Sequence, residues 1–223
     1  MIEYTVAQEK RRFRQIVGSV MFILVLAGGW IWPLLGYFVP FCMLIGMGIG
    51  IFRGRKWCDW LCPRGSFFDI AIKPFSPKAQ APRVFKNNKF KISVLALMML
   101  ILVSNIISRW PNPYLVGKFF IIMLSVTTVI GIILGLIFHQ RSWCFFCPVG
   151  SLAGWLGGSR KPLKIISELC NECQLCTKAC PMQNSPLEQK RQEVLGSKED
   201  ACIKCDLCVR ICPSQALVRE GKK

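Results

Sequence analysis

The sequence predicts a membrane all-α domain of four transmembrane helices in two repeated hairpins, followed by a small α+β domain rich in cysteine. Hydrophobic residues make up 52% of the 223 residues and charged residues only 18%, with a mean hydropathy of +0.41. These values do not describe a single soluble globule. Thirteen cysteines fall into short repeated spacings, and most of them lie in the last third of the chain. The apolar residues and the cysteines therefore belong to different domains.

The first two spans come from one long apolar run. Residues 16–52 contain no charged side chain, and this stretch is roughly twice the ~20 residues that cross a bilayer once as a helix. Pro33 and Pro40 interrupt the run, and the Trp and Tyr residues near them are typical of a membrane interface. We expect spans at about 15–32 and 37–53.

The second two spans lie between residues 92 and 138. The apolar runs at about 92–108 and 118–138 are separated by a proline-rich turn that ends at Pro113. We therefore expect a four-span membrane domain over residues 1–158.

Each predicted hairpin is followed by a similar cysteine loop. Residues 57–66 read W-C-D-W-L-C-P-R-G-S, and residues 143–151 read W-C-F-F-C-P-V-G-S, with one residue fewer between the cysteines. Parallel repeats in membrane proteins are commonly related by an axis along the membrane normal. The two loops are therefore expected to meet at one membrane surface.

Basic residues predict the orientation of the chain. Four Lys or Arg residues lie at positions 10–14 and ten between Arg53 and Lys91, whereas the two turns carry only Arg109 and Lys118. By the positive-inside rule, both termini, the central loop and the C-terminal domain face the cytoplasm of a bacterial or archaeal cytoplasmic membrane. The net charge of +17 is thus interpreted as membrane topology, and no nucleic-acid partner is expected.

The predicted C-terminal domain, residues 159–223, carries the spacing C-x-x-C-x-x-C-x-x-x-C-P twice. Thiolates are soft ligands for iron, and this spacing is typical of proteins that bind two [4Fe-4S] clusters, in which the fourth cysteine of each run ligates the other cluster. Zinc sites and disulfides are the alternatives. The predicted ligands are Cys170, Cys173, Cys176 and Cys212 for cluster 1, and Cys202, Cys205, Cys208 and Cys180 for cluster 2.

The cysteines of the two membrane-edge loops allow several interpretations. Four thiols that converge could ligate a third [4Fe-4S] cluster, act as redox-active thiols, or hold copper or zinc. The remaining cysteine, Cys42, is expected to be a small apolar residue within a span. The four membrane-edge cysteines are Cys58, Cys62, Cys144 and Cys147.

His139 is the only histidine, so a haem with two histidine ligands cannot be built within the chain, although a His and Met pair could still hold one. Electrons are then expected to travel by iron-sulfur clusters, by quinone or by a partner's cofactors. His139 and Asp59 are candidate acceptors for the protons of a quinol. The alternatives are a plain interfacial histidine and a solvated carboxylate.

The four spans, the two cysteine loops and the doubled C-terminal run resemble the NapH and MauN type of membrane ferredoxin-like proteins. The wider group includes NosR-type regulators and CcoG-type copper reductases. In this family both loop motifs are usually C-x-x-x-C-P, from which the second loop departs by one residue. The resemblance implies electron exchange with the quinone pool, usually quinol oxidation, and transfer to other redox subunits that contain cytochromes or iron-sulfur clusters.

The leading hypothesis is therefore a membrane electron-transfer subunit of a quinol-linked complex. A copper reductase or metal-site assembly factor that uses the four membrane-edge cysteines is the alternative. A third possibility is a structural anchor that docks soluble redox subunits without a quinone site.

Overall fold

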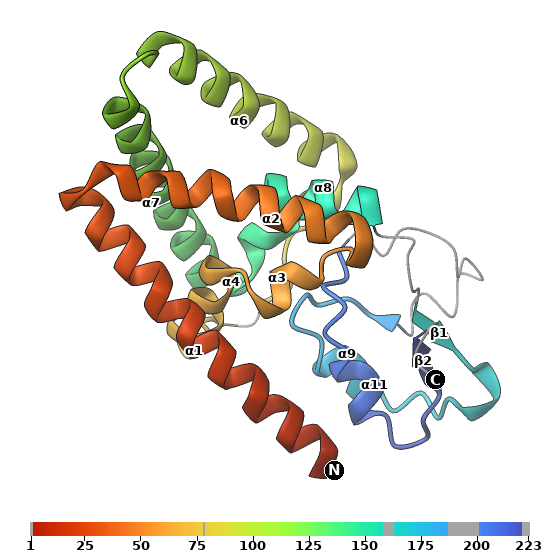
Figure 1. Cartoon of the computed structure of the whole chain (residues 1–223). Helices are drawn as coiled ribbons and strands as arrows, with labels where there is room; N and C mark the ends of the chain where they lie inside the picture. Colours follow the sequence, from red (N-terminus) through yellow and green to blue (C-terminus); the bar gives the residue numbers. More distant parts are fainter. Residues whose placement is uncertain (1, 78, 158–162, 187–200, 220–223) are drawn as a thin grey trace.

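The computed structural model describes residues 2–77, 79–157, 163–186 and 201–219. Four long helices form one part of the molecule, and a small unit with two short strands lies beside the loops at one end of them (Figure 1). The predicted boundary between residues 158 and 159 lies outside the described residues.

The first pair of long helices is α1, Ile2–Ile31, and α2, Phe38–Arg53, joined by the 3-10 turn η1, Pro33–Tyr37. Pro33 stands in the first turn of η1, where its missing N–H is not needed. Helix α1 begins well before the apolar run because the preceding Glu, Lys and Arg residues are good helix formers. Its polar N-terminal part extends to the C-terminal unit, where α1 contacts helix α11, Leu207–Ile211.

The second pair is α6, Asn88–Arg109, and α7, Pro113–Ile137. The side chain of Asn87 caps α6 by accepting a hydrogen bond from the backbone N–H of Lys89 at 3.1 Å. Pro113 begins α7, and η1 packs against this helix. Gly36 and Gly117 permit the contact, since a Cβ on Gly36 would lie 2.1 Å from the carbonyl oxygen of Gly117.

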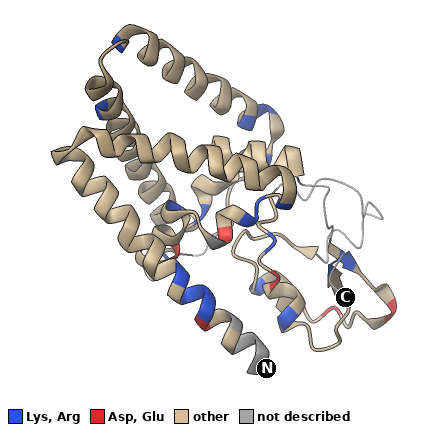
Figure 2. Cartoon of the chain, in the orientation of Figure 1, with Lys and Arg blue, Asp and Glu red and all other residues tan. Residues whose placement is uncertain are grey.

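In the described part of the chain, four helical segments are long and apolar enough to cross a membrane: Gln8–Ile31, Pro33–Arg53, Asn88–Arg109 and Pro113–Ile137. Their outward surfaces carry large apolar side chains, among them Leu24 and Leu44, each 65% exposed, and Leu100, 69% exposed. Such surfaces suit lipid better than water. Figure 2 shows Lys and Arg along the N-terminal part of α1 and around the loops, with few at the opposite ends of the long helices.

Short helices follow α2 and α7 and carry the cysteine loops. After α2 come α3, Lys56–Trp60, α4, Pro63–Phe67, the π-helical turn η2, Phe68–Ile72, and α5, Arg83–Lys86. After α7 come the 3-10 turn η3, Ser142–Phe145, and α8, Pro148–Gly157. Helix α4 packs against α1 and α8 against α2, so both loops lie at the same end of the four helices.

The C-terminal unit is a small α+β structure. Strands β1, Leu163–Ile165, and β2, Leu217–Arg219, pair antiparallel, with Leu163 opposite Arg219. The described residues between the strands include the 3-10 turn η4, Ser167–Leu169, and the short helices α9, Leu175–Lys178, and α11, which contact each other.

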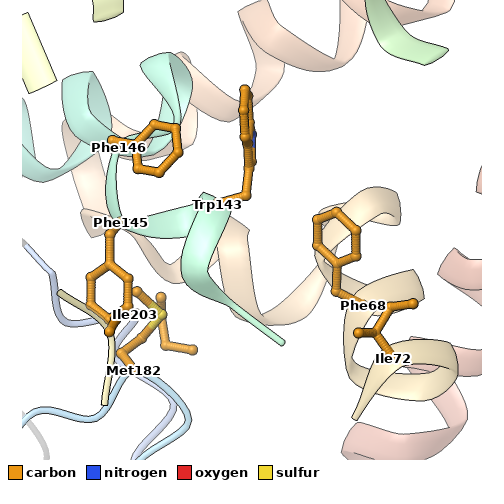
Figure 3. Close-up of a cluster of buried hydrophobic side chains, with 8 residues drawn as sticks. Phe68, Ile72, Trp143, Phe145, Phe146, Met182 and Ile203 are labelled. Atoms are coloured by element: carbon orange, nitrogen blue, oxygen red, sulfur yellow. The ribbon is translucent and has the colours of Figure 1, made fainter. Parts of the chain in front are cut away.

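One buried apolar cluster joins the membrane-edge loops to the C-terminal unit (Figure 3). Phe145 comes from η3, whereas Met182 and Ile203 belong to the C-terminal unit, and all three are at most 2% exposed. The other members are Phe68, Ile72, Ala81, Trp143 and Phe146. Gln183 adds two hydrogen bonds, from the N–H of Ala81 at 3.0 Å and to the carbonyl oxygen of Ala79 at 2.8 Å.

Candidate functional site

The four membrane-edge cysteines come together from two loops. Cys58 lies in α3 and Cys62 caps α4, where its Sγ accepts a hydrogen bond from the N–H of Gly65 at 3.4 Å. Cys144 lies in η3, and Cys147 immediately precedes α8. The thiols of the two loops lie close enough to affect each other's pKa: Cys147 raises the pKa of Cys58, and Cys144 raises that of Cys62. The two pairs therefore form one group.

These cysteines are half-buried, and burial of the thiols controls the protonation of Cys58, Cys62 and Cys144. Burial raises the pKa of Cys62 to about 12 and that of Cys144 to about 11. Burial also raises the pKa of Cys58, although the charges of Arg55 and Arg141 and a hydrogen bond from Arg55 oppose it. Without a metal these three thiols are therefore protonated, and metal binding has to release their protons.

Three arginines surround the thiol group. Arg55 and Arg141 are 1% and 0% exposed, and each contacts the first cysteine of the other loop. Arg64 stacks on Trp143, with 4.7 Å from its guanidinium carbon to the ring centroid, and donates a hydrogen bond to the carbonyl oxygen of Thr127. Guanidinium groups so close to thiols favour an anion at this site.

Asp69 is the centre of a buried polar network beside the thiols. Arg141 donates to both of its carboxylate oxygens, through Nε at 2.8 Å and Nη2 at 2.6 Å. Gln15 donates at 2.6 Å and Arg11 at 3.2 Å, both from α1. Burial raises the pKa of Asp69, but the charges of Arg141 and Arg11 and the hydrogen bonds from Arg141 and Gln15 outweigh it, so the pKa is lowered. Asp69 is therefore ionised at neutral pH.

The two candidate proton acceptors lie near this network and are both buried. Asp59 is 2% exposed and accepts a hydrogen bond from Nε of Arg11 at 2.9 Å, so it is not a solvated carboxylate. His139 is 5% exposed, and its Nδ1 accepts from the N–H of Arg141 at 3.3 Å. Burial lowers the pKa of His139 to about 4, with the positive charges of Arg141 and Lys73 adding to this effect and Asp69 opposing it. The imidazole is neutral at neutral pH.

The first C-terminal set of cysteines encloses a cavity. Ile165, Leu175 and Leu217 also line it, so the walls are partly apolar. Cys173 is exposed, which places this set on the outer side of the unit. The cavity brings together all four cysteines predicted for cluster 1: Cys170, Cys173, Cys176 and Cys212.

The second C-terminal set lies deeper. Burial raises the pKa of Cys205 to about 12, and the charges of Asp59 and Cys180 raise it further. Cys208 interacts with Cys205, Cys202 and Cys180, so the fourth cysteine of the first run has joined the second run. The effects of Asp59 and Arg11 on Cys205 place this set next to the membrane-edge loops.

Both C-terminal runs share an unusual backbone. Among the described residues, six non-glycine residues have positive φ. They occupy equivalent positions in the two runs: the residues on either side of the second cysteine and the third residue after the fourth cysteine. Such left-handed conformations cost energy and persist where the surrounding structure requires them. The six residues are Glu172, Gln174 and Gln183 in the first run and Lys204, Asp206 and Gln215 in the second.

The donor sets fit iron-sulfur clusters by their chemistry. Each consists of four cysteines, which are the usual ligands of [4Fe-4S] clusters. Within the described residues no three His, Cys, Asp or Glu side chains form a site for a single metal ion. The four thiolates of a cluster bind four different irons, so they need to surround a cavity and not a point.

Comparison with known proteins finds two families of 4Fe-4S domains. A family described as a 4Fe-4S binding domain matches residues 35–82 and 121–165, and a 4Fe-4S dicluster domain family matches residues 169–217. The methylamine utilization ferredoxin-type protein MauN of Paracoccus denitrificans is 25% identical over 67% of this chain and 56% of its own length. The chain is a MauN/NapH-type 4Fe-4S ferredoxin protein.

Two further relatives of this MauN/NapH-type protein have a similar extent of match. MauN of Methylobacillus flagellatus is 25% identical over 59% of this chain and 50% of its own length. An uncharacterized protein of Methanocaldococcus jannaschii is 32% identical over 63% of this chain and 56% of its own length. The chain thus spans about half the length of the curated relatives it matches. No solved structure matches.

Sequence reasoning did not single out the buried arginines of this MauN/NapH-type protein. Arg55 and Arg141 both stand three residues before the first cysteine of their loop, so each loop reads R-x-W-C. This repeated arginine was the available indication. The sequence around Asp69 gave no indication of its role, because its partners Gln15, Arg11 and Arg141 are distant in the sequence.

Proposed function

We propose that this protein exchanges electrons with the quinone pool, in the direction of quinol oxidation, and passes them to partner redox subunits. That it is a ferredoxin-type iron-sulfur electron-transfer protein follows from its family. The quinone, the partners and the sites of electron entry and exit belong to the proposal.

The observation that carries the proposal is the shared core between the membrane-edge cysteines and the C-terminal unit. Cys58, Cys144 and Cys147 pack against the same buried cluster as Cys180 and Cys205. Distance limits electron transfer, so thiol sets that share one core are well arranged to exchange electrons.

We assign the ligands of two clusters by the crossed pattern. Cluster 2, with Cys202, Cys205, Cys208 and Cys180, is the inner one, and cluster 1, with Cys170, Cys173, Cys176 and Cys212, is the outer one. A bound [4Fe-4S] cluster takes up or gives up one electron at a time. The outer set opens to the aqueous side at Cys173, where a partner subunit can approach.

We further propose that Cys58, Cys62, Cys144 and Cys147 hold a third [4Fe-4S] cluster. Four thiols, the buried Arg55 and Arg141, and the half-buried Arg64 form this site. In the described part of the chain, Nε of Arg64 is buried without a hydrogen-bond partner. A cluster with four thiolates is an anion and would compensate this buried positive charge.

The equivalence of the two cysteine loops also supports two repeated hairpins with cytoplasmic termini. Each loop follows a candidate span and carries an arginine three residues before its first cysteine. Both loops lie at the same end of the long helices, together with most of the Lys and Arg residues (Figures 1 and 2). On this arrangement residues 1–158 form the membrane domain and residues 159–223 the cluster domain.

Quinol oxidation also needs acceptors for two protons. Asp59 and His139 are the candidates because both lie beside the membrane-edge cysteines. His139 is neutral at neutral pH and has one ring nitrogen already hydrogen-bonded. Proton uptake at Asp59 would require Arg11 to move away or to keep only its contact with Asp69. Slower quinol oxidation in Asp59→Asn than in His139→Gln would identify Asp59 as the acceptor.

The first experiment is anaerobic iron and acid-labile sulfide analysis with redox-titrated EPR on the purified full-length protein. Wild type is compared with a variant in which Cys58, Cys62, Cys144 and Cys147 are all Ser, and Cys42→Ser serves as the control. About twelve irons falling to about eight would support the third cluster, with four irons per cluster. About eight irons in both proteins would refute it.

The quinone part of the proposal has its own test. The protein in lipid nanodiscs is mixed with a short-chain quinol, and cluster reduction is followed by EPR and by bleaching of the visible absorption. Reduction that depends on the membrane-edge cysteines is expected. A protein that neither reduces nor oxidises quinone would refute this part.

Copper handling is the second candidate function, because thiols are soft ligands that suit copper. It would require the thiols to move closer together, since no three of them form a single-ion site in the described residues. Stoichiometric copper in the purified protein, lost in the quadruple Ser variant, would support this function over the third cluster.

A further inference from the structure

The two cysteine loops are joined by a pair of equivalent arginines. Arg55 belongs to the first loop, and its Nη2 donates a hydrogen bond to the backbone carbonyl oxygen of Cys144 in the second. Arg141 belongs to the second loop, and its Nη1 donates to the carbonyl oxygen of Cys58 in the first at 3.3 Å. Each arginine stands three residues before the first cysteine of its own loop. Its guanidinium contacts the first cysteine of the other loop.

Both guanidinium groups are fully enclosed. Arg55 and Arg141 are among the largest fully buried side chains of the described residues. Removing a charged group from water is expensive unless other groups compensate it. Arg141 is compensated by Asp69, whereas Arg55 faces the thiols and also donates a hydrogen bond to Cys58. The two arginines therefore differ in what balances their charge.

The C-P-x-G-S part of the second loop provides the space that Arg55 occupies. A Cβ on Gly150 would lie 2.7 Å from Nη2 of Arg55, so glycine at this position leaves the guanidinium in place. The hydrogen bond from Arg55 to the carbonyl oxygen of Cys144 thus depends on Gly150 of the second loop as well as on Arg55 of the first.

We propose that Arg55 and Arg141 form a reciprocal clamp that holds the two cysteine loops together and sets the reduction potential of the cluster between them. The clamp fixes the thiols of both loops through the two cysteine carbonyls. Its positive charge stabilises the added negative charge of the reduced cluster. The part concerning potential rests on the proposed third cluster, whereas the joining of the loops does not.

The test uses Arg55, because changing Arg141 would also remove two of the hydrogen bonds that Asp69 accepts. Full-length Arg55→Gln and Arg55→Lys are compared with wild type and with Arg53→Gln, an exposed arginine two residues away. In redox-titrated EPR, Arg55→Gln is expected to disfavour reduction of the membrane-edge cluster at least tenfold, which for one electron is about 59 mV towards lower potential. Arg55→Lys keeps the charge and should fall between Arg55→Gln and wild type. A potential in Arg55→Gln equal to that in Arg53→Gln would refute the electrostatic role.

A second measurement remains decisive if the membrane-edge site binds no iron. In full-length protein stripped of iron, the rate at which a maleimide labels Cys58, Cys62, Cys144 and Cys147 is measured by peptide mass spectrometry. Arg55→Gln is expected to increase these rates several-fold over Arg53→Gln, because the loops separate. Equal rates would refute the clamp. Faster labelling in Arg55→Gln than in Arg53→Gln, in a protein whose membrane-edge site binds no iron as purified, would refute the third cluster and support the clamp.

Discussion

Replacing Asp69 by Asn removes the negative charge on which three other side chains converge. Arg141, Gln15 and Arg11 all donate hydrogen bonds to this carboxylate, and Arg141 does so with two nitrogens. Asn has nearly the same shape but carries no charge, and its amide N–H₂ would face donors. The buried guanidinium of Arg141 would then lose its counter-ion.

The size of the effect follows from this geometry. At the 2.6 Å between Nη2 of Arg141 and Oδ2 of Asp69, two unit charges attract by about 6 kcal/mol at an effective dielectric constant of about 20. Much of this attraction only offsets the desolvation of both groups. Removing one partner of a buried pair, however, leaves the other charge uncompensated and typically costs about 3–5 kcal/mol. We therefore expect Asp69→Asn to lower the free energy of unfolding by this amount.

The assay is unfolding in detergent micelles by titration with SDS, followed by tryptophan fluorescence. The exposed residue Glu168 provides the control, since Glu168→Gln should change stability by less than about 0.5 kcal/mol. A double-mutant cycle with Arg141→Gln should show a strong favourable coupling between Asp69 and Arg141. A loss below about 1 kcal/mol for Asp69→Asn, or additive single variants, would refute the reasoning.

Three further predictions concern the fold. Because the pKa of Asp69 is lowered in the folded protein, its stabilising contribution is present above the ordinary pKa of 3.8 and is lost as pH falls from there through the folded value. Unfolding titrations in SDS from pH 6 down to the lowest pH that the folded protein tolerates should show this loss below pH 3.8 in wild type and not in Asp69→Asn. Phe145→Ala should cost about 3–5 kcal/mol and increase hydrogen exchange in the C-terminal unit, whereas Phe75→Ala, at an exposed site, should change little. Gly157→Ala places a Cβ 2.0 Å from a backbone oxygen of α2 and should cost at least about 1–3 kcal/mol, while Gly48→Ala, which meets nothing within 4 Å, should not destabilise the protein by unfolding titration.

The long helices could be predicted because their cause is local. Each apolar run is long enough to span a bilayer, and proline marks the turns between them, so four candidate spans follow from composition and length. The start of α1 could not be obtained in the same way. Its first residues are polar, and their helix propensity continues the helix beyond the apolar run to the C-terminal unit.

The cysteine spacing predicted 4Fe-4S domains, which the family comparisons confirm. The charges around the cysteines could not be predicted, because an arginine that is buried looks the same in a sequence as one in water. Arg141 and Asp69 are 72 residues apart in the sequence, and only the folded chain brings them together. The left-handed backbone of the six residues in the two runs could not be predicted either, because glycine is the usual sign of this conformation and none of the six is a glycine.

The contact of α1 and of the shared core with the C-terminal unit has a consequence for kinetics. Phe145, Met182 and Ile203 hold this unit against the membrane-edge loops, and the polar end of α1 lies against α11. The unit is therefore fixed in place and does not act as a diffusing shuttle. In the proposed transfer to a partner subunit, the step inside the chain is then unimolecular and independent of concentration, and the approach of the partner is the step whose rate depends on encounter. Turnover should rise with partner concentration and saturate, and lengthening the segment between the two parts of the chain should not accelerate it.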